Sequence, residues 1–130
     1  MEGIMFKYIL AVLMLGCCVF GTIRARAADD AWTPADTRRE WGYQGIQAID
    51  YLQTMNIARH PDQWHEYNII LGPHPSQRRV TAYFVSTAAL HYTISRALTE
   101  EYRADWQNIT IGFETGVVAR NFSLGIRVGF

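Results

Sequence analysis

The sequence has only two cysteines, Cys17 and Cys18, and both stand in its first apolar run. The rest of the chain therefore has no thiol for a disulfide, a zinc site or a cysteine nucleophile. Charge is also scarce, because charged residues make up 18% of the chain, against roughly 25% in an average soluble domain. Lysine is almost missing, since Lys7 is the one lysine among twelve basic residues. Twelve acidic residues balance them, so no basic surface for nucleic acid is expected.

The first residues have the features of an export signal. Lys7 precedes an apolar run over 8–23, and the small residues of Ala25-Arg26-Ala27 follow it. This order predicts a signal peptide over residues 1–27, with cleavage before Ala28. Two alternatives are lipidation at Cys17 and retention of the segment as a membrane anchor. All three place the protein in the cell envelope, at the inner membrane or in the periplasm.

The remainder, residues 28–130, is long enough for one domain. Thr33, Pro34 and Asp36 form a helix-start signature, with Thr33 as the cap and Pro34 at the first position. We expect a helix over about 34–58. Its predicted apolar face follows a spacing of three to four residues and consists of Trp41, Gly45, Ile49, Leu52 and Met55.

A proline-rich central loop follows over 59–75. Ser76 then caps a predicted second helix over about 76–98. Its body, Val80 to Leu98, contains no acid and a single charged residue, Arg96. This composition predicts a membrane span, and the alternative is a soluble periplasmic bundle in which this helix is the most buried one.

A third helix is expected over about 105–120, where Trp106, Ile109, Phe113 and Val117 recur at helical period. Apolar and polar residues alternate over 122–130, which indicates a terminal strand or an extended tail. The predicted fold is all-α: a signal or anchor segment, then a three-helix apolar bundle with a proline-rich central loop and a short extended tail.

The central loop also carries a resemblance. Gln53-Thr54, His60-Pro61, Glu66-Tyr67-Asn68, and Leu71-Gly72-Pro73-His74-Pro75-Ser76, with a later Arg120-Asn121, resemble a pattern shared by a group of small exported or membrane proteins of bacteria and prophages. The chain departs from that pattern at Ile69, where relatives have a proline after the asparagine. The resemblance implies a few apolar helices and no activity.

Candidate functional residues are those of this pattern together with ionisable residues inside the helices. They are Asp50, Gln53, Thr54, His60, His65, Glu66, Asn68, His74, Glu114, Arg120 and Asn121. None is assigned a catalytic role. A weaker metal hypothesis rests on His60, Asp62, His65 and Glu66, which combine imidazole and carboxylate ligands at a spacing of no standard site, so no metal or cofactor is predicted.

Asp50 and Glu114 stand inside otherwise apolar helices, where a carboxylate needs a partner. The expected partners of Asp50 are Arg120, or a hydrogen bond to Gln53 or Thr54. Such a pair is interpreted as structural, with a proton or ligand site as the alternative.

Function is predicted at the level of class. Small size, the export signal and the abundance of aromatics favour a membrane or envelope accessory protein that acts through protein contacts. The expected partners are the membrane and another envelope protein. One alternative is a metal-dependent or acid/base enzyme that uses the central His, Asp and Glu residues. The other is a phage lysis or superinfection-exclusion factor.

Overall fold

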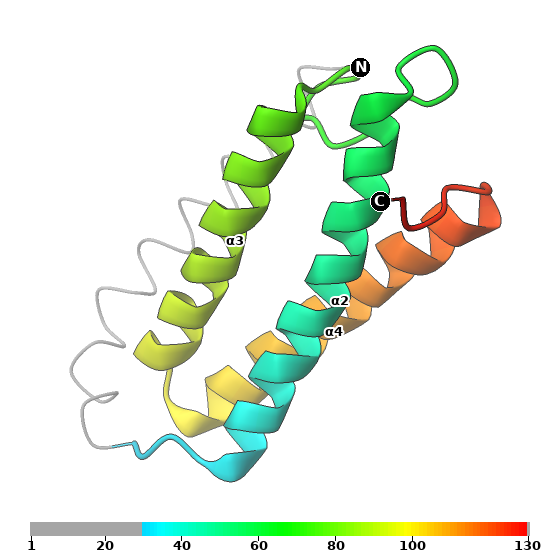
Figure 1. Ribbon diagram of the computed structural model, residues 1–130. Coiled ribbons are helices and arrows are strands. Elements are labelled where there is room, and N and C mark those ends of the chain that lie inside the picture. The colour runs from blue at the N-terminus through cyan, green and yellow to red at the C-terminus, as the bar shows by residue number, and fades with distance from the viewer. Residues whose placement is uncertain (1–29, 130) are drawn as a thin grey trace, which may run out of the picture.

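The computed structural model describes residues 30–129, and the predicted signal or anchor segment lies outside them. Within this range the chain forms three helices and no strand, so the all-α prediction is confirmed. They are α2 (Pro34–Arg59), α3 (Gln77–Ala97) and α4 (Glu100–Ser123), shown in Figure 1. Helix α4 begins earlier than predicted, at the acidic residues Glu100 and Glu101, whose charges favour a helix N-terminus.

Two helices begin at the caps that the sequence predicted. The Thr33 side chain accepts from the backbone N–H of Asp36 at 3.1 Å, and Asp36 accepts in return from the N–H of Thr33 at 2.9 Å. This is a complete capping box. Ser76 accepts from the N–H of Arg79 at 3.3 Å. Thr99, which precedes α4, makes no such side-chain hydrogen bond.

The end of the described chain forms no strand, and residues 126–129, which have no regular secondary structure, form a short tail. Phe122 and Ser123 are the last residues of α4, and a Schellman turn follows, in which Ile126 N–H donates to Asn121 O and Gly125 N–H to Phe122 O, both at 3.0 Å. Gly125 has φ +85°, a left-handed conformation that favours glycine. The turn directs Ile126 into the protein, where it is buried. The alternating pattern thus arises from a helix end and its cap.

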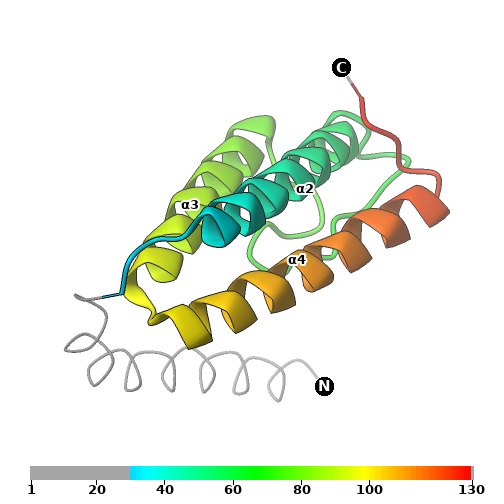
Figure 2. The same cartoon turned by 90° about the horizontal axis from the view of Figure 1, so that it is seen from below.

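Helix α2 packs against both other helices, whereas α3 and α4 contact each other much less. The two are joined at Leu98 and Thr99 and diverge from this corner, as Figure 1 shows. The loop over 60–76 occupies the side on which they diverge (Figure 2). A small apolar core of Met55, Leu71, Val80 and Phe84 joins α2, the loop and α3.

Parts of the predicted apolar stripes of α2 and α4 are exposed, although Met55 at the end of the α2 stripe is buried in the core. Trp41 is 74% exposed, Ile109 70% and Phe113 72%. Many buried side chains of the three helices are polar or charged. They are Asp36, Glu40, Gln47, Asp50, Gln53, Thr54, His91, Ser95, Arg103, Gln107 and Asn121. The interior of the bundle therefore combines these polar side chains with the small apolar core, and apolar side chains are exposed over parts of its surface.

The predicted membrane span over 80–98 is also wrong. In residues 30–129, no helix combines the length and the hydropathy that crossing a bilayer needs. Although this segment contains no acid, its hydropathy is lowered by Thr81, Ser86, Thr87, His91, Thr93 and Ser95.

Candidate functional site

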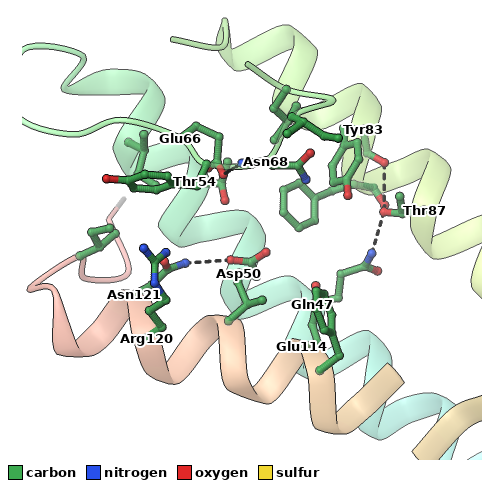
Figure 3. Close-up of a pocket in the computed structure, with 18 of the residues that line it drawn as sticks. Gln47, Asp50, Thr54, Glu66, Asn68, Tyr83, Thr87, Glu114, Arg120 and Asn121 are labelled. Atoms are coloured by element: carbon green, nitrogen blue, oxygen red, sulfur yellow. Dashed lines mark hydrogen bonds between the residues drawn. The ribbon is translucent and has the colours of Figure 1, made fainter. Parts of the chain in front are cut away.

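A cavity of about 500 Å³ lies among the three helices, the central loop and the C-terminal tail. Figure 3 shows it in close-up. Eight of the candidate residues predicted from the sequence line it: Asp50, Thr54, His65, Glu66, Asn68, Glu114, Arg120 and Asn121. Gln53, His60 and His74 are not among the lining residues. The structure thus brings together residues that are spread over more than half of the chain.

Asp50 is the most deeply buried carboxylate of the cavity, with 8% of the residue exposed. Its Oδ1 accepts from Asn121 Nδ2 at 3.1 Å, the dashed bond between these residues in Figure 3. Within residues 30–129 its second oxygen has no hydrogen bond. Burial, followed by the negative charges of Glu114 and Glu66, raises the pKa of Asp50 to about 7, although the hydrogen bond from Asn121 acts in the opposite direction.

Gln53 shares the hydrogen-bond partner of Asp50, the side chain of Asn121. Asn121 Nδ2 also donates to Gln53 Oε1 at 3.2 Å, and Gln53 Nε2 donates to the carbonyls of Val118 and Ile126, each at 3.4 Å. Gln53 is fully buried, and its hydrogen bonds connect α2 with α4 and with the C-terminal tail. Asp50, Gln53 and Asn121 thus form a single hydrogen-bonded unit, in which Asn121 joins Asp50 to Gln53 in place of the predicted direct hydrogen bond.

Glu114 enters the cavity from α4. Burial raises its pKa, and it forms no ion pair in the part of the chain that the structure describes. Gln47 Nε2 donates to Thr87 Oγ1 at 2.7 Å, a hydrogen bond that connects α2 with α3 in the cavity wall (Figure 3).

The central loop supplies the third carboxylate. Glu66 Oε1 accepts from the N–H of Asn68 at 2.7 Å, and Asn68 Oδ1 accepts from the N–H of Ile70 at 2.9 Å. Gly72, at φ +75°, closes the turn, and its N–H donates to the carbonyl oxygen of Asn68 at 2.8 Å. The turn therefore forms with Ile69 after Asn68, because the Asn68 side chain fixes the backbone.

Arg120 does not pair with Asp50, contrary to the first of the predicted partnerships. Its guanidinium lies 4.8 Å from the centroid of the Tyr67 ring, in a cation–π contact between α4 and the loop. The described residues hold no ion pair of Arg120 with Asp50 or Glu114.

The weak metal hypothesis finds no support in the geometry. Residues 30–129 contain no group of three or more His, Cys, Asp or Glu side chains that could hold a metal ion. His60 Nδ1 is bonded to the Asn56 carbonyl at 2.9 Å. His65 and His74 pack edge to face, with ring centroids 4.8 Å apart.

A second polar cluster lies at the other end of α2 and was not predicted. Arg103 is fully buried and donates to Asp36 Oδ2 at 2.9 Å, to Ser95 O at 2.9 Å and to Leu98 O at 2.8 Å. Arg39 bonds the other oxygen of Asp36. Burial alone raises the pKa of Asp36, but the hydrogen bonds from Thr33, Arg103 and Arg39 outweigh it and bring the pKa to about 2.

His91 connects this cluster to the cavity through Glu40, which Gln107 joins to Arg39. Its Nδ1 lies 3.1 Å from Glu40 Oε1 and its Nε2 lies 2.9 Å from Thr110 Oγ1, and Thr110 lines the cavity. Burial lowers the pKa of His91, although its contact with Glu40 acts in the opposite direction. The ring stacks on Tyr43, with centroids 3.5 Å apart.

Several lining residues were missed by the sequence interpretation. The aromatic wall consists of Tyr43, Tyr67, Tyr83, Phe84 and Phe113, and the polar residues Gln47, Thr87 and Thr110 complete it. A signal was present, because Asp36, Glu40, Tyr43, Gln47, Asp50, Thr54 and Ile57 follow one helical face. The apolar stripe beside this face has the same period, so periodicity alone does not indicate which of the two is buried.

The balance of charge decides what the cavity can hold. Its described lining includes three carboxylates, Asp50, Glu66 and Glu114, against one guanidinium, that of Arg120. Aromatic rings surround them. Comparisons of the chain with models of protein families, with curated proteins and with solved structures give no match, so the function is argued from this cavity.

Proposed function

We propose that the cavity binds a small organic molecule that bears an amine, and that the protein is a ligand-binding accessory protein of the cell envelope. The observation that carries the proposal is the convergence of Asp50, Glu66 and Glu114 on one cavity with Arg120 as the one arginine in its lining. The envelope location rests on the sequence of residues 1–27.

The chemistry of the wall favours an ammonium group. Carboxylates that are neither paired nor well solvated gain a counter-ion when a cation enters. Aromatic faces attract the same charge, and Tyr43, Tyr83 and Phe84 lie in this wall. An apolar body of the ligand would contact Ile57, Leu71 and Val117. A volume of about 500 Å³ is within the range of small-molecule sites.

Calorimetric titration with three molecules of one shape tests the proposal. 2-Phenylethylamine, 2-phenylethanol and 3-phenylpropionate share a body and differ in head-group charge. We expect the amine to bind, the alcohol to bind at least about tenfold more weakly, and the carboxylate not to bind. Hexylamine, titrated in parallel, tests whether an aliphatic body is accepted. Equal binding of all three phenyl compounds, or no binding of either amine, would contradict the proposal.

The matched variants are Asp50→Asn and Glu114→Gln, each of which removes one negative charge and keeps the shape. We expect each to weaken amine binding by about tenfold or more. Asp105→Asn is the control, because Asp105 is an exposed acid of α4 outside the cavity. The same loss in Asp105→Asn would show that only the overall charge matters.

The second candidate is acid/base catalysis in the same cavity. It is favoured by the pKa of Asp50 at about 7, a value suited to proton transfer near neutral pH. Recovery of the bound amine chemically unchanged after long incubation with the protein supports binding alone, whereas turnover that is lost in Asp50→Asn supports catalysis.

A further inference from the structure

We infer that the outward face of α3 docks on an anionic lipid surface, with the helix lying flat along it. This surface is separate from the cavity, and its docking does not depend on the proposed ligand.

The face is a straight stripe of six exposed residues. Arg78, Ala82, Val85, Ala89, Tyr92 and Arg96 are all exposed, and they follow one another at steps of three or four residues along one side of the helix. The buried residues Val80, Phe84, His91 and Ser95 lie on the other side. At about 1.5 Å per residue the stripe is roughly 27 Å long.

The charge of α3 indicates the occupant. Between Gln77 and Leu98 the helix and its cap carry three arginines and no acid. Arg78 and Arg96 stand at the two ends of the stripe, and the middle is apolar, with Ala82, Ala89 and a Val85 that is 64% exposed. Apolar side chains between cationic ends match a surface with an apolar interior under anionic head groups.

An aromatic cluster at one end supports the same occupant. The Arg96 guanidinium lies 4.9 Å from the centroid of the Trp32 ring. The ring centroids of Trp32 and Tyr92 are 5.9 Å apart. Tryptophan and tyrosine settle at the depth of lipid head groups, where one edge is apolar and the other wet.

The other exposed apolar residues do not share this charge. Ile109 and Phe113 of α4 are as exposed as Val85, but α4 also carries the exposed acids Glu101 and Asp105. Anionic head groups repel such a helix, so lipid should select α3 over α4.

Site-specific quenching in vesicles tests the inference on the full chain. Cys17 and Cys18 are replaced by serine, and a fluorophore is attached at V85C or, as the matched control, at I109C. Phosphatidylcholine vesicles with brominated acyl chains are used with and without phosphatidylglycerol. If residues 8–23 anchor the chain, they act equally on both labelled proteins, so the comparison reports the local contact of each helix.

With phosphatidylglycerol present, we expect strong quenching at position 85 and little at position 109. Quenching at 85 should fall when phosphatidylglycerol is omitted. It should also fall in an R78Q/R96Q background, where each arginine contributes roughly a fivefold change in partitioning. Circular dichroism checks that each variant keeps its helices.

Three results would overturn the inference. They are equal quenching at both positions, quenching at 85 that is insensitive to both the lipid charge and the arginines, and no quenching at 85. Crosslinking of V85C between two chains without vesicles would instead assign the face to a second copy.

Discussion

Asp36 and Asp50 are buried carboxylates on the same helix, yet their surroundings shift the pKa values in opposite directions. Arginine and backbone donors surround Asp36 and hold its pKa at about 2. Asp50 has one amide donor and two nearby carboxylates, and its pKa is about 7. The charge of Asp36 is balanced by Arg39 and Arg103, whereas Asp50 has no ion pair in the part of the chain that the structure describes. This contrast separates the structural cluster from the candidate site.

The first prediction concerns stability and pH at Asp50. Its folded pKa of about 7 lies above the value of 3.8 expected when unfolded, so between these values the folded state holds a proton that the unfolded state has lost. Stability therefore falls as pH rises from about 4 to 7, by on the order of 4 kcal/mol from this group. Urea denaturation of Asp50→Asn should show a flatter profile over that range. An unchanged profile would contradict the raised pKa.

The second prediction concerns the pair of Asp36 and Arg103. Arg103→Met leaves the Asp36 charge buried with one arginine fewer, and we expect a loss of about 3 to 5 kcal/mol in the free energy of unfolding at neutral pH. Arg38→Met is the control, since Arg38 is exposed, and should change stability by less than about 0.5 kcal/mol. Equal losses in chemical denaturation would argue against a structural role for the pair.

At the scale of elements, the third prediction compares two threonines that precede helices. Thr33→Ala removes the capping box of α2 and should cost about 1 kcal/mol. Thr99→Ala should cost clearly less, because Thr99 makes no side-chain cap hydrogen bond to α4. Thermal unfolding of the two variants measures the difference. A larger loss in Thr99→Ala would contradict this account of the helix starts.

The helices were largely predictable because their signals are local. Thr33, Pro34 and Ser76 mark two helix starts within a few residues of chain, and both caps form. The direction in which a helix faces is not local information. On each helix, the apolar stripe that includes Trp41 or Ile109 has the same period as the polar stripe that includes Glu40 or Gln107. Only the packing of α2 against α4 buries the polar stripes.

At the scale of the whole molecule, eight of the residues that line the cavity could be named from the sequence, but the geometry that joins them could not. Asp50 and Asn121 are 71 residues apart in the chain and share one hydrogen bond. Charge rules suggested Arg120 as the partner of Asp50, but Tyr67 of the loop takes the guanidinium instead. That choice depends on how the loop folds over the cavity, which periodicity does not reveal.

The central claim is that the carboxylates of the cavity outnumber its one arginine and that a ligand amine supplies the missing positive charge. At pH 6 Asp50 is mostly protonated, since its pKa is about 7. Binding of an ammonium group favours the ionised carboxylate, so the complex should release close to one proton, and release should decline by pH 8.5. Affinity should rise with pH over the same range.

Calorimetric titration of 2-phenylethylamine at pH 6, in buffers that differ in ionisation enthalpy, measures this proton directly. The account predicts that the observed enthalpy varies linearly with the buffer's ionisation enthalpy, with a slope near one released proton, and that Asp50→Asn largely removes the slope. A slope of zero at pH 6, an uptake of protons, or an unchanged slope in Asp50→Asn would contradict it.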